Sequence, residues 1–466
     1  MKVQTLAADL RRRLRPRGFT REIIEAGHRD YEAARRVWNG SIDRRPTAVL
    51  RCRDAEDVAA AVTAAVDLGL PLAVRGGGHS TPGLSTVDDG IVVDLSALRR
   101  VTVDAVARRA VVGGGALLGD LDRATQEHGL AVPAGQVSHT GVAGLTLGGG
   151  VGYLSRQLGL TVDSLVSAEV VTAGGETVTV SADEHADLFW ALRGGGGNFG
   201  VVTRFEFALH EVGPLVYAGA LVYPFERAAE VMRASRAVMA EAPDELSIHE
   251  ILLTVPEHPP FPEHLQGRPA ILLSPVHLGD EEQARADLEP LRELGPAFDL
   301  VGPMPYLALQ SMIDDDTRHG LGHYGKSHWL GGYEDGLIDA LVERMTHVSS
   351  PMSHIITARM GGAIERVAAG DTAFAHRFAA NLLWIIGLWE DPSADPEPHR
   401  AWVNDVFEAA RPASTGGVYV NALDEEGPER VRAAYGAETF ERLRGVKRRW
   451  DPGNAFRLNQ NIRPAA

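Results

Sequence analysis

The residues with the clearest chemical potential lie in the glycine-rich segment RGGGHS at positions 75–80. An apolar run ends at Arg75, three bare glycines follow, and the imidazole of His79 comes next. Clustered glycines let a backbone approach a ligand closely, whereas isolated glycines usually mark turns. A neutral imidazole is also a nucleophile near physiological pH. The segment therefore indicates a large flat ligand that lies against the backbone and touches His79.

Three further glycine clusters occur before residue 210, in VVGGG (111–115), LGGGVG (147–152) and RGGGGNFG (193–200). The longer stretch 135–163 offers many backbone N–H groups without bulky neighbours. Concave arrays of such groups bind anions, including a pyrophosphate. A phosphorylated cofactor could thus be bound here without a lysine cluster.

Two nucleotide-binding patterns are rejected from their context. GLGHYGKS (320–327) matches the phosphate-loop pattern, but an acidic segment precedes it and no helix signal follows. Gly195, Gly197 and Gly200 have the dinucleotide-binding spacing, but a helical pattern precedes them and a strand pattern follows, which inverts the required order. These three glycines therefore indicate either ligand contacts or the end of a helix.

The bulk composition is that of a globular protein of more than one domain. The chain has 466 residues, of which 44% are hydrophobic and 23% charged. The net charge of −16 argues against a nucleic-acid or anionic-membrane partner. Cys52 is the single cysteine, so no internal disulfide and no cysteine metal site is expected, and no metal ligand set is predicted. No apolar run is long enough to span a membrane, and the N-terminus lacks a secretory signal, which predicts a cytoplasmic location.

Local patterns predict the elements that position the first glycine loop. Asp54 is typical of a helix N-cap, and valines at every fourth position give the helix after it one apolar face. Gly174 and Gly175 join two β-rich runs, which predicts a hairpin over 167–181. Further strands are expected at 47–52, 70–74, 91–95 and 201–207, and a further helix at 185–193.

Four segments, taken together and in order, resemble the berberine-bridge-enzyme-like branch of the vanillyl-alcohol-oxidase flavoprotein superfamily. They are PLAVRGGGHSTPGLS (71–85), GLTLGGGVGYLSRQLGL (144–160), LFWALRGGGGNFGVVT (188–203) and WDPGNAFRLNQNIRP (450–464). The resemblance implies an α+β fold with a two-part PCMH-type FAD-binding domain, formed by residues 1–214 and 425–466. Residues 215–424 are then a substrate domain, an antiparallel sheet backed by helices.

The resemblance also implies a covalent flavin. The histidine of the GGGH loop in this family is bonded to the 8α-methyl carbon of the flavin ring, and here that residue is His79. Many relatives add a second bond through a cysteine, whose position is taken by Val137. We therefore expect FAD with a single attachment. Thr140 lies at the position that controls oxygen access in relatives, and its valine-like shape favours an oxidase.

The catalytic base is not evident from the sequence. Relatives carry Y-x-N-Y where this chain has Tyr419, Asn421 and Ala422, and the strand pattern at 381–389, where other relatives carry the base, is wholly apolar. Tyr153 and Tyr419 are the candidate bases, although each could equally be a packing aromatic. Tyr324 and Lys326 are further expected on the substrate side.

The sequence thus predicts an FAD-dependent oxidase that removes a hydride from a small alcohol, sugar or secondary metabolite and passes electrons to oxygen. A flavin dehydrogenase and a non-catalytic flavin-bearing binding protein remain the alternatives, and no oligomeric state is indicated. Catalysis is assigned to Tyr153, Tyr419 and Asn421. Cofactor contacts are expected from Arg75, Gly76, Gly77, Gly78, His79, Ser80, Gly135, His139, Thr140, Gly141, Gly144, Leu145, Thr146, Gly148, Gly149, Gly150, Tyr153, Gly197, Asn198, Gly200, Val201, Val202, Asn459 and Asn461.

Overall fold

A small, mostly parallel sheet carries the first glycine loop. In the computed structural model, which describes residues 2–465, Asp54 caps the helix between the first two parallel strands by accepting a hydrogen bond from the Asp57 N–H. The loop with His79 begins where the strand Leu72–Arg75 ends. The strands lie in the order β1 (Ile23–Glu25), β2 (Ala48–Arg51), β4 (Ile91–Asp94), β3 (Leu72–Arg75), with helices α1 (Lys2–Leu14), α2 (Tyr31–Arg35) and α3 (Ala55–Leu68).

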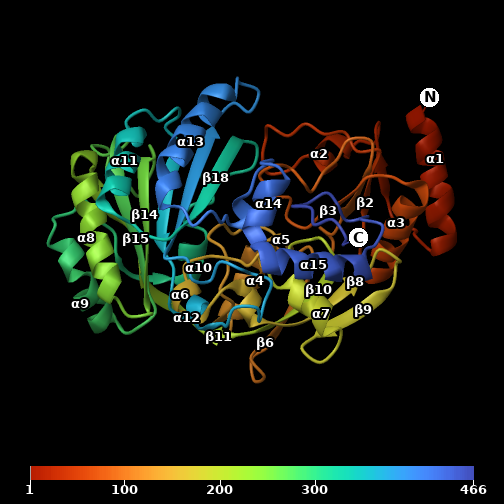
Figure 1. Ribbon diagram of the computed structural model, residues 1–466, viewed down its shortest axis with the longest axis horizontal. Coiled ribbons are helices and arrows are strands. Elements are labelled where there is room, and N and C mark those ends of the chain that lie inside the picture. Colours follow the sequence, from red (N-terminus) through yellow and green to blue (C-terminus); the bar gives the residue numbers. More distant parts are fainter. Residues whose placement is uncertain (1, 466) are drawn as a thin grey trace.

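A second, antiparallel sheet completes this half of the molecule, on the right in Figure 1. The predicted hairpin is confirmed, since its two strands pair antiparallel from Ser167 with Ser181 to Val171 with Thr177. The strands lie in the order β5 (Val101–Asp104), β6 (Arg109–Gly113), β10 (Val201–Ala208), β8 (Leu165–Val171), β9 (Thr177–Ser181). Its helices are α4 (Leu118–Gln126), α5 (Val142–Leu147), α6 (Ser155–Leu158), α7 (Ala186–Leu192), α14 (Pro428–Tyr435) and α15 (Ala437–Trp450).

A nine-stranded antiparallel sheet forms the other half, on the left in Figure 1. Helices α8, α9, α11 and α13 pack on one face through a shared hydrophobic core, and part of the opposite face lines the site. The strands run in the order β16 (Phe298–Asp299), β13 (Leu221–Pro224), β15 (Pro269–His277), β14 (Leu246–Thr254), β19 (His354–Arg359), β20 (Asn381–Trp389), β18 (Gly322–Leu330). In addition, β12 (Leu215–Ala218) pairs with β15, and β17 (Gly302–Pro305) pairs with β12. The helices here are α8 (Ala228–Glu241), α9 (Glu281–Arg292), α10 (Tyr306–Gln310), α11 (Asp335–Met345), α12 (Ala363–Arg366) and α13 (Glu397–Ala410), and a two-stranded ribbon joins β7 (Leu130–Ala131) to β11 (His210–Glu211).

The sheets and helices confirm the predicted α+β class and the antiparallel sheet backed by helices. Residues 322–327 of the rejected phosphate-loop pattern lie in β18, so they form an extended strand where that motif requires a tight loop before a helix.

The chain returns to the first half at its C-terminal end. Helix α15 packs against α7, and the Lys447 ammonium then holds the tail in place. Lys447 Nζ donates to the carbonyl oxygens of Asn198 (2.6 Å) and Phe456 (2.9 Å) and pairs with Asp451 at 2.7 Å. Both members of this ion pair have 0% exposed side chains, so their mutual contact compensates the loss of hydration.

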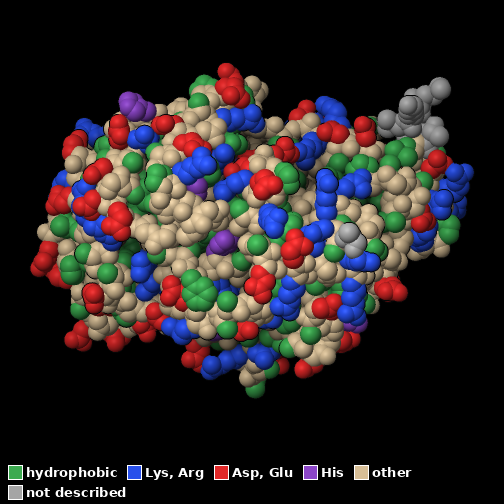
Figure 2. Space-filling view, viewed as in Figure 1, with side chains coloured by type: hydrophobic (Ala, Val, Ile, Leu, Met, Phe, Trp, Pro, Cys, Tyr) green, Lys and Arg blue, Asp and Glu red, His purple; other side chains and the backbone are tan. Residues whose placement is uncertain are grey.

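Within residues 2–465, no helix is long and apolar enough to cross a bilayer. Figure 2 shows acidic and basic side chains interspersed over one face of the molecule.

Candidate active site

A cavity of about 380 Å³ lies between the glycine-rich loops and the face of the nine-stranded sheet that is turned away from α8, α9, α11 and α13. Its walls consist mainly of apolar side chains and of backbone and side-chain amide groups. No described Asp, Glu, Lys or Arg side chain lines it. Ligand sites are typically concave and apolar with a few placed polar groups, which fits this cavity.

Glycines serve two different purposes at the cavity wall. A Cβ on Gly77 would lie 2.3 Å from the Gly141 nitrogen, so these two glycines let the two loops meet. Gly144 and Gly197 instead line the cavity with no atom within 4 Å of a Cβ position. The backbone N–H groups of residues 76–81 donate to no other described residue. One part of the wall is therefore bare backbone with free donors.

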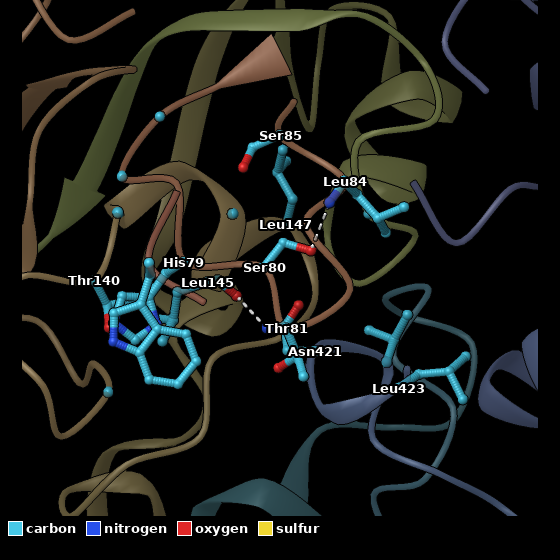
Figure 3. Close-up of a pocket in the computed structure, with 18 of the residues that line it drawn as sticks. His79, Ser80, Thr81, Leu84, Ser85, Thr140, Leu145, Leu147, Asn421 and Leu423 are labelled. Carbon is cyan, nitrogen blue, oxygen red and sulfur yellow. Dashed lines mark hydrogen bonds between the residues drawn. The ribbon is translucent and has the colours of Figure 1, made fainter. Parts of the chain in front are cut away.

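His79 lies at the edge of this cavity, at the end of the loop that follows β3 (Figure 3). Its ring stacks on Trp38, with ring centroids 4.2 Å apart and an interplanar angle of 18°. Its Nε2 lies 3.1 Å from Nδ1 of His139. Burial holds the pKa of His79 well below 6.5, and nearby His139 and His319 lower it further. The imidazole is therefore neutral at physiological pH, as a nucleophilic role requires.

Tyr419 and Asn421 bind the loop between α5 and α6 to the wall. The Tyr419 hydroxyl accepts hydrogen bonds from the N–H groups of Gly150 and Val151, both at 3.2 Å, and from Asn421 Nδ2 at 3.0 Å. Asn421 Nδ2 also donates to the Leu145 carbonyl at 3.0 Å, a bond drawn in Figure 3. Burial raises the pKa of Tyr419 although these donors lower it, so the phenol stays protonated. Both residues line the cavity, and their hydrogen bonds position the loop.

The C-terminal tail forms part of the same wall. Asn459 lines the cavity and donates to the Gly197 carbonyl at 3.0 Å, while its Oδ1 is buried without a described partner. Ser85 Oγ is a second buried and unpaired polar atom of the lining. Such orphaned atoms indicate a missing hydrogen-bonding ligand.

The structure brings most of the predicted site residues together at one cavity. Tyr419 and Asn421 line it, as do the cofactor candidates Gly76, Gly77, Gly78, His79, Ser80, Gly135, Thr140, Gly141, Gly144, Leu145, Gly197, Gly200, Val201, Val202 and Asn459. The candidates outside the lining are Arg75, His139, Thr146, Gly148, Gly149, Gly150, Tyr153, Asn198 and Asn461.

The glycine run 148–150 packs against protein. A Cβ on Gly148 would lie 2.0 Å from the Asn421 side chain, and one on Gly150 would lie 2.0 Å from Thr161 Oγ1. Gly149 and Gly150 also have φ values of +117° and +82°, which favour glycine. The bare backbone here serves a tight turn and close packing, which the sequence pattern does not distinguish from ligand contact.

Other excluded candidates have protein partners of their own. Arg75 pairs with Asp94 at 2.8 Å, and Thr146 is fully buried within the protein core. His139 contacts His79 instead of the cavity. The side chain of Asn198 bonds to Gln460 and Ile462, on either side of Asn461, and so fixes the tail.

Tyr153 is not placed as a catalytic base. Its ring is buried in a hydrophobic cluster with Leu154 and Tyr306, outside the cavity lining, and burial raises its pKa to about 12. The expectation for Tyr324 and Lys326 is also not met. Because side chains alternate along β18, both residues lie on its helix-covered side, where Lys326 lies over the Phe407 ring of α13.

Sequence reasoning missed the polar side chains on the side of the cavity that the nine-stranded sheet forms. His249 on β14, His323 on β18 and His354 on β19 all line the cavity, each on a different strand. Trp38 and Trp384 add aromatic surface. Along its strand, each histidine is flanked by residues that face the helices, because successive side chains of a strand point to opposite faces. This alternation shows which face a histidine occupies only once the pairing of the strands is known.

The walls fit a flavin nucleotide, whose diphosphate can be bound by free backbone N–H groups. Free backbone donors, open space at Gly144 and Gly197, two orphaned polar side chains and a neutral imidazole meet at one apolar cavity. This arrangement, shared between a two-sheet half and a nine-stranded half, defines the class as an FAD-linked oxidoreductase.

Comparisons with known proteins agree with this class. Residues 46–181 match a family model described as FAD binding domain, and residues 418–463 match one described as Berberine and berberine like. An FAD-linked oxidoreductase of Dictyostelium discoideum is 31% identical, over 95% of this chain and 94% of its own. (R)-6-hydroxynicotine oxidase of Paenarthrobacter nicotinovorans is 30% identical, over 96% and 98%. The chain belongs to the berberine-bridge-like family of FAD-linked oxidoreductases.

Solved structures show the same relationship. The crystal structure of 6-hydroxy-D-nicotine oxidase from Arthrobacter nicotinovorans superposes with a TM-score of 0.85 and 29% sequence identity, covering 97% of this chain and 99% of that one. The likeness therefore extends through both halves of the molecule.

Proposed function

We propose that this protein is an FAD-linked oxidase that takes a hydride from a small uncharged substrate and passes the electrons to oxygen. The single observation that carries the proposal is the neutral, buried imidazole of His79 at the edge of an uncharged cavity whose walls include bare backbone. The name of the similar hydroxynicotine oxidase supports an oxidase. Bound FAD would supply the hydride acceptor.

The cofactor would be held by the chain's own backbone and by neutral side chains. The free N–H groups of residues 76–81 would bind phosphate or ring oxygens, with Ser85 and Asn459 adding hydrogen-bonding groups. Gly144 and Gly197 leave the room that a ring or a ribose needs. No arginine or lysine is required, in keeping with anion binding by backbone amides.

A single covalent attachment through His79 completes the proposal. Attachment joins a ring nitrogen of His79 to the 8α-methyl carbon. Because His79 Nε2 bonds to His139, the Nδ1 atom of His79 is the one left to react. Val137 lines the cavity where relatives carry the second attaching cysteine, and Cys52 lies fully buried in another core. The chain therefore has no thiol at the cavity for a second bond.

Oxygen as electron acceptor is supported by Thr140. Its side chain has the size of valine, and its carbonyl oxygen accepts a hydrogen bond from the Leu118 N–H at 2.9 Å, which fixes the loop at the cavity wall. A residue of this size, at the position that controls oxygen access in relatives, supports oxygen as the acceptor.

The decisive experiment follows the flavin and the peroxide in one preparation. Purified protein should be yellow, should keep its colour in the acid-precipitated pellet, and should release hydrogen peroxide with an alcohol substrate in air. Anaerobic bleaching followed by slow recolouring in air would replace the oxidase with a dehydrogenase. Colourless protein that takes up no FAD would overturn the proposal altogether.

A further inference from the structure

Two histidines flank the central strand of the cavity wall. In the paired strands, His323 of β18 lies opposite Leu388 of β20, and His354 of β19 lies opposite Ile386 of β20. All four residues line the cavity. The imidazoles therefore stand on either side of β20, the strand whose own side chains towards the cavity are entirely apolar.

The hydrogen bonds of His354 fix its tautomer. Its Nδ1 lies 2.9 Å from the Met352 carbonyl oxygen, which can only accept, so Nδ1 carries the proton. The lone pair is therefore on Nε2, for which no described residue provides a hydrogen bond. A histidine with its Nδ1–H held by a backbone carbonyl presents a ready proton acceptor.

The two rings are neutral at physiological pH. Burial lowers the pKa of His354, although Asp316 raises it. Burial and the neighbouring His354 lower the pKa of His323 to about 3. His323 is 6% exposed, and its Nδ1 is buried without a partner. The wall thus holds two uncharged imidazoles with unfilled hydrogen-bonding positions.

The pair lies close to the residue expected to hold the cofactor. The Trp38 ring has His79 stacked on it at 4.2 Å, and the His323 ring lies 4.8 Å from the same indole. Trp38 itself is fixed by a 2.6 Å hydrogen bond from Nε1 to the Thr317 carbonyl. A substrate against this wall would therefore lie beside the cofactor-binding loop.

We propose that His354 accepts the hydroxyl proton of the substrate, that His323 forms a hydrogen bond with the substrate from the other side of β20, and that the substrate is an uncharged aromatic alcohol. The proposal rests on the proposed oxidase function. The lining has no charged side chain for an acid or an ammonium group, whereas Trp38, Trp384 and Ile356 offer aromatic and aliphatic contact. The two tyrosine candidates are weaker acceptors, since both phenols remain protonated.

In such an alcohol the O–H bond breaks and its proton passes to Nε2 of His354. The carbinol C–H bond breaks as the C–O bond becomes a carbonyl, and bound FAD would supply the acceptor for the hydride and its two electrons. Oxygen then takes up two electrons and two protons as hydrogen peroxide, and His354 returns to its neutral form.

The test uses the flavin-loaded full chain and measures anaerobic flavin bleaching with 4-methoxybenzyl alcohol and cinnamyl alcohol. His354→Gln keeps a hydrogen-bonding side chain but no proton acceptor, so the bleaching rate should fall by about 100-fold or more. His354→Ala should be equally slow and should regain rate with added imidazole. His399→Gln is the matched control, because His399 is a half-buried histidine outside the cavity lining that should leave the rate unchanged.

The outcomes separate this inference from the proposed function. Flavin content and visible spectrum establish that each variant has folded and loaded. A His354→Gln variant that loads flavin and bleaches as fast as wild type overturns the role of His354. Faster bleaching by mandelate or cellobiose than by either aromatic alcohol overturns the substrate class. A wild-type protein that holds no flavin, or reduces it with no compound of the panel, contradicts the proposed function itself.

Discussion

The Nε2 atom of His79 and the Nδ1 atom of His139 lie 3.1 Å apart, so one imidazole donates a proton that the other accepts. His139 lies outside the cavity lining and therefore acts through His79. A histidine whose one ring nitrogen is engaged in this way reacts through the other.

His139→Ala should slow covalent attachment without preventing it. The variant loses the partner that orients His79 and accepts its proton, so attachment should slow by on the order of 10²-fold. The measurement mixes apoprotein with FAD and follows the flavin retained after acid precipitation. His319→Ala is the control, because its ring lies 5.0 Å from that of His139 but bonds to neither histidine. Equal rates in the two variants would contradict the assignment.

His79→Ala should leave bound flavin without a covalent bond. The bare wall at Gly144 and Gly197 remains intact, so the variant should still purify yellow. After acid precipitation the colour should move to the supernatant, whereas the wild-type pellet keeps it. Colour in the variant pellet would show attachment elsewhere on the chain.

Gly197→Val should reduce FAD binding with little effect on the apoprotein. A Cβ at this position meets nothing within 4 Å, so the side chain would occupy cavity space without a clash. Gly445→Val is a matched control on the exposed side of α15, where a Cβ also has open space. Titration of each apoprotein with FAD should show weaker binding for Gly197→Val alone. Wild-type affinity in that variant would place the cofactor away from Gly197.

The free energy of unfolding should decrease on acidification partly through His249. Burial lowers its pKa from 6.5 to about 4. Between these values the unfolded chain binds a proton that the folded protein excludes, so stability is lost as the pH falls. This residue accounts for about 3 kcal/mol over the full interval. Urea titrations at neutral and acidic pH should show a smaller loss in His249→Gln than in wild type, and an identical loss would contradict the prediction.

Lys447→Met should destabilise the protein by about 3 to 5 kcal/mol, because it leaves Asp451 buried without its cation. The carboxylate would retain only its bonds from the N–H groups of Ala455 and Phe456. Urea unfolding measures the change, and adding Asp451→Asn to the variant should recover part of it. If the variant with Lys447→Met alone is as stable as wild type, the ion pair contributes little to the free energy of unfolding.

Elements defined by local signals were predictable from the sequence. The strand–helix–strand unit around Asp54 and the hairpin at Gly174 depend on neighbouring residues, and the structure has both. The His79 loop could also be placed, because it directly follows a predicted strand. These features need no knowledge of how distant segments pair.

The sheet wall could not be predicted in the same way. His323 and His354 face one cavity only because their strands pair with β20 in a particular register. Tyr153 lies outside the cavity lining and follows a glycine turn with positive φ values, where side-chain direction cannot be counted along the chain. The run at 148–150 likewise contains glycine for packing, a requirement set by Thr161 and Asn421.

The attachment of the C-terminal tail has a consequence for how the protein is made. Phe456, Leu458, Asn459 and Gln460 belong to the cavity wall, so this wall is absent until synthesis has reached the last segment of the chain. Flavin loading therefore needs residues 456–460 to have been synthesised and to have packed into the wall. A premature stop codon within α15 would spare the strands of every sheet and yet yield a colourless polypeptide.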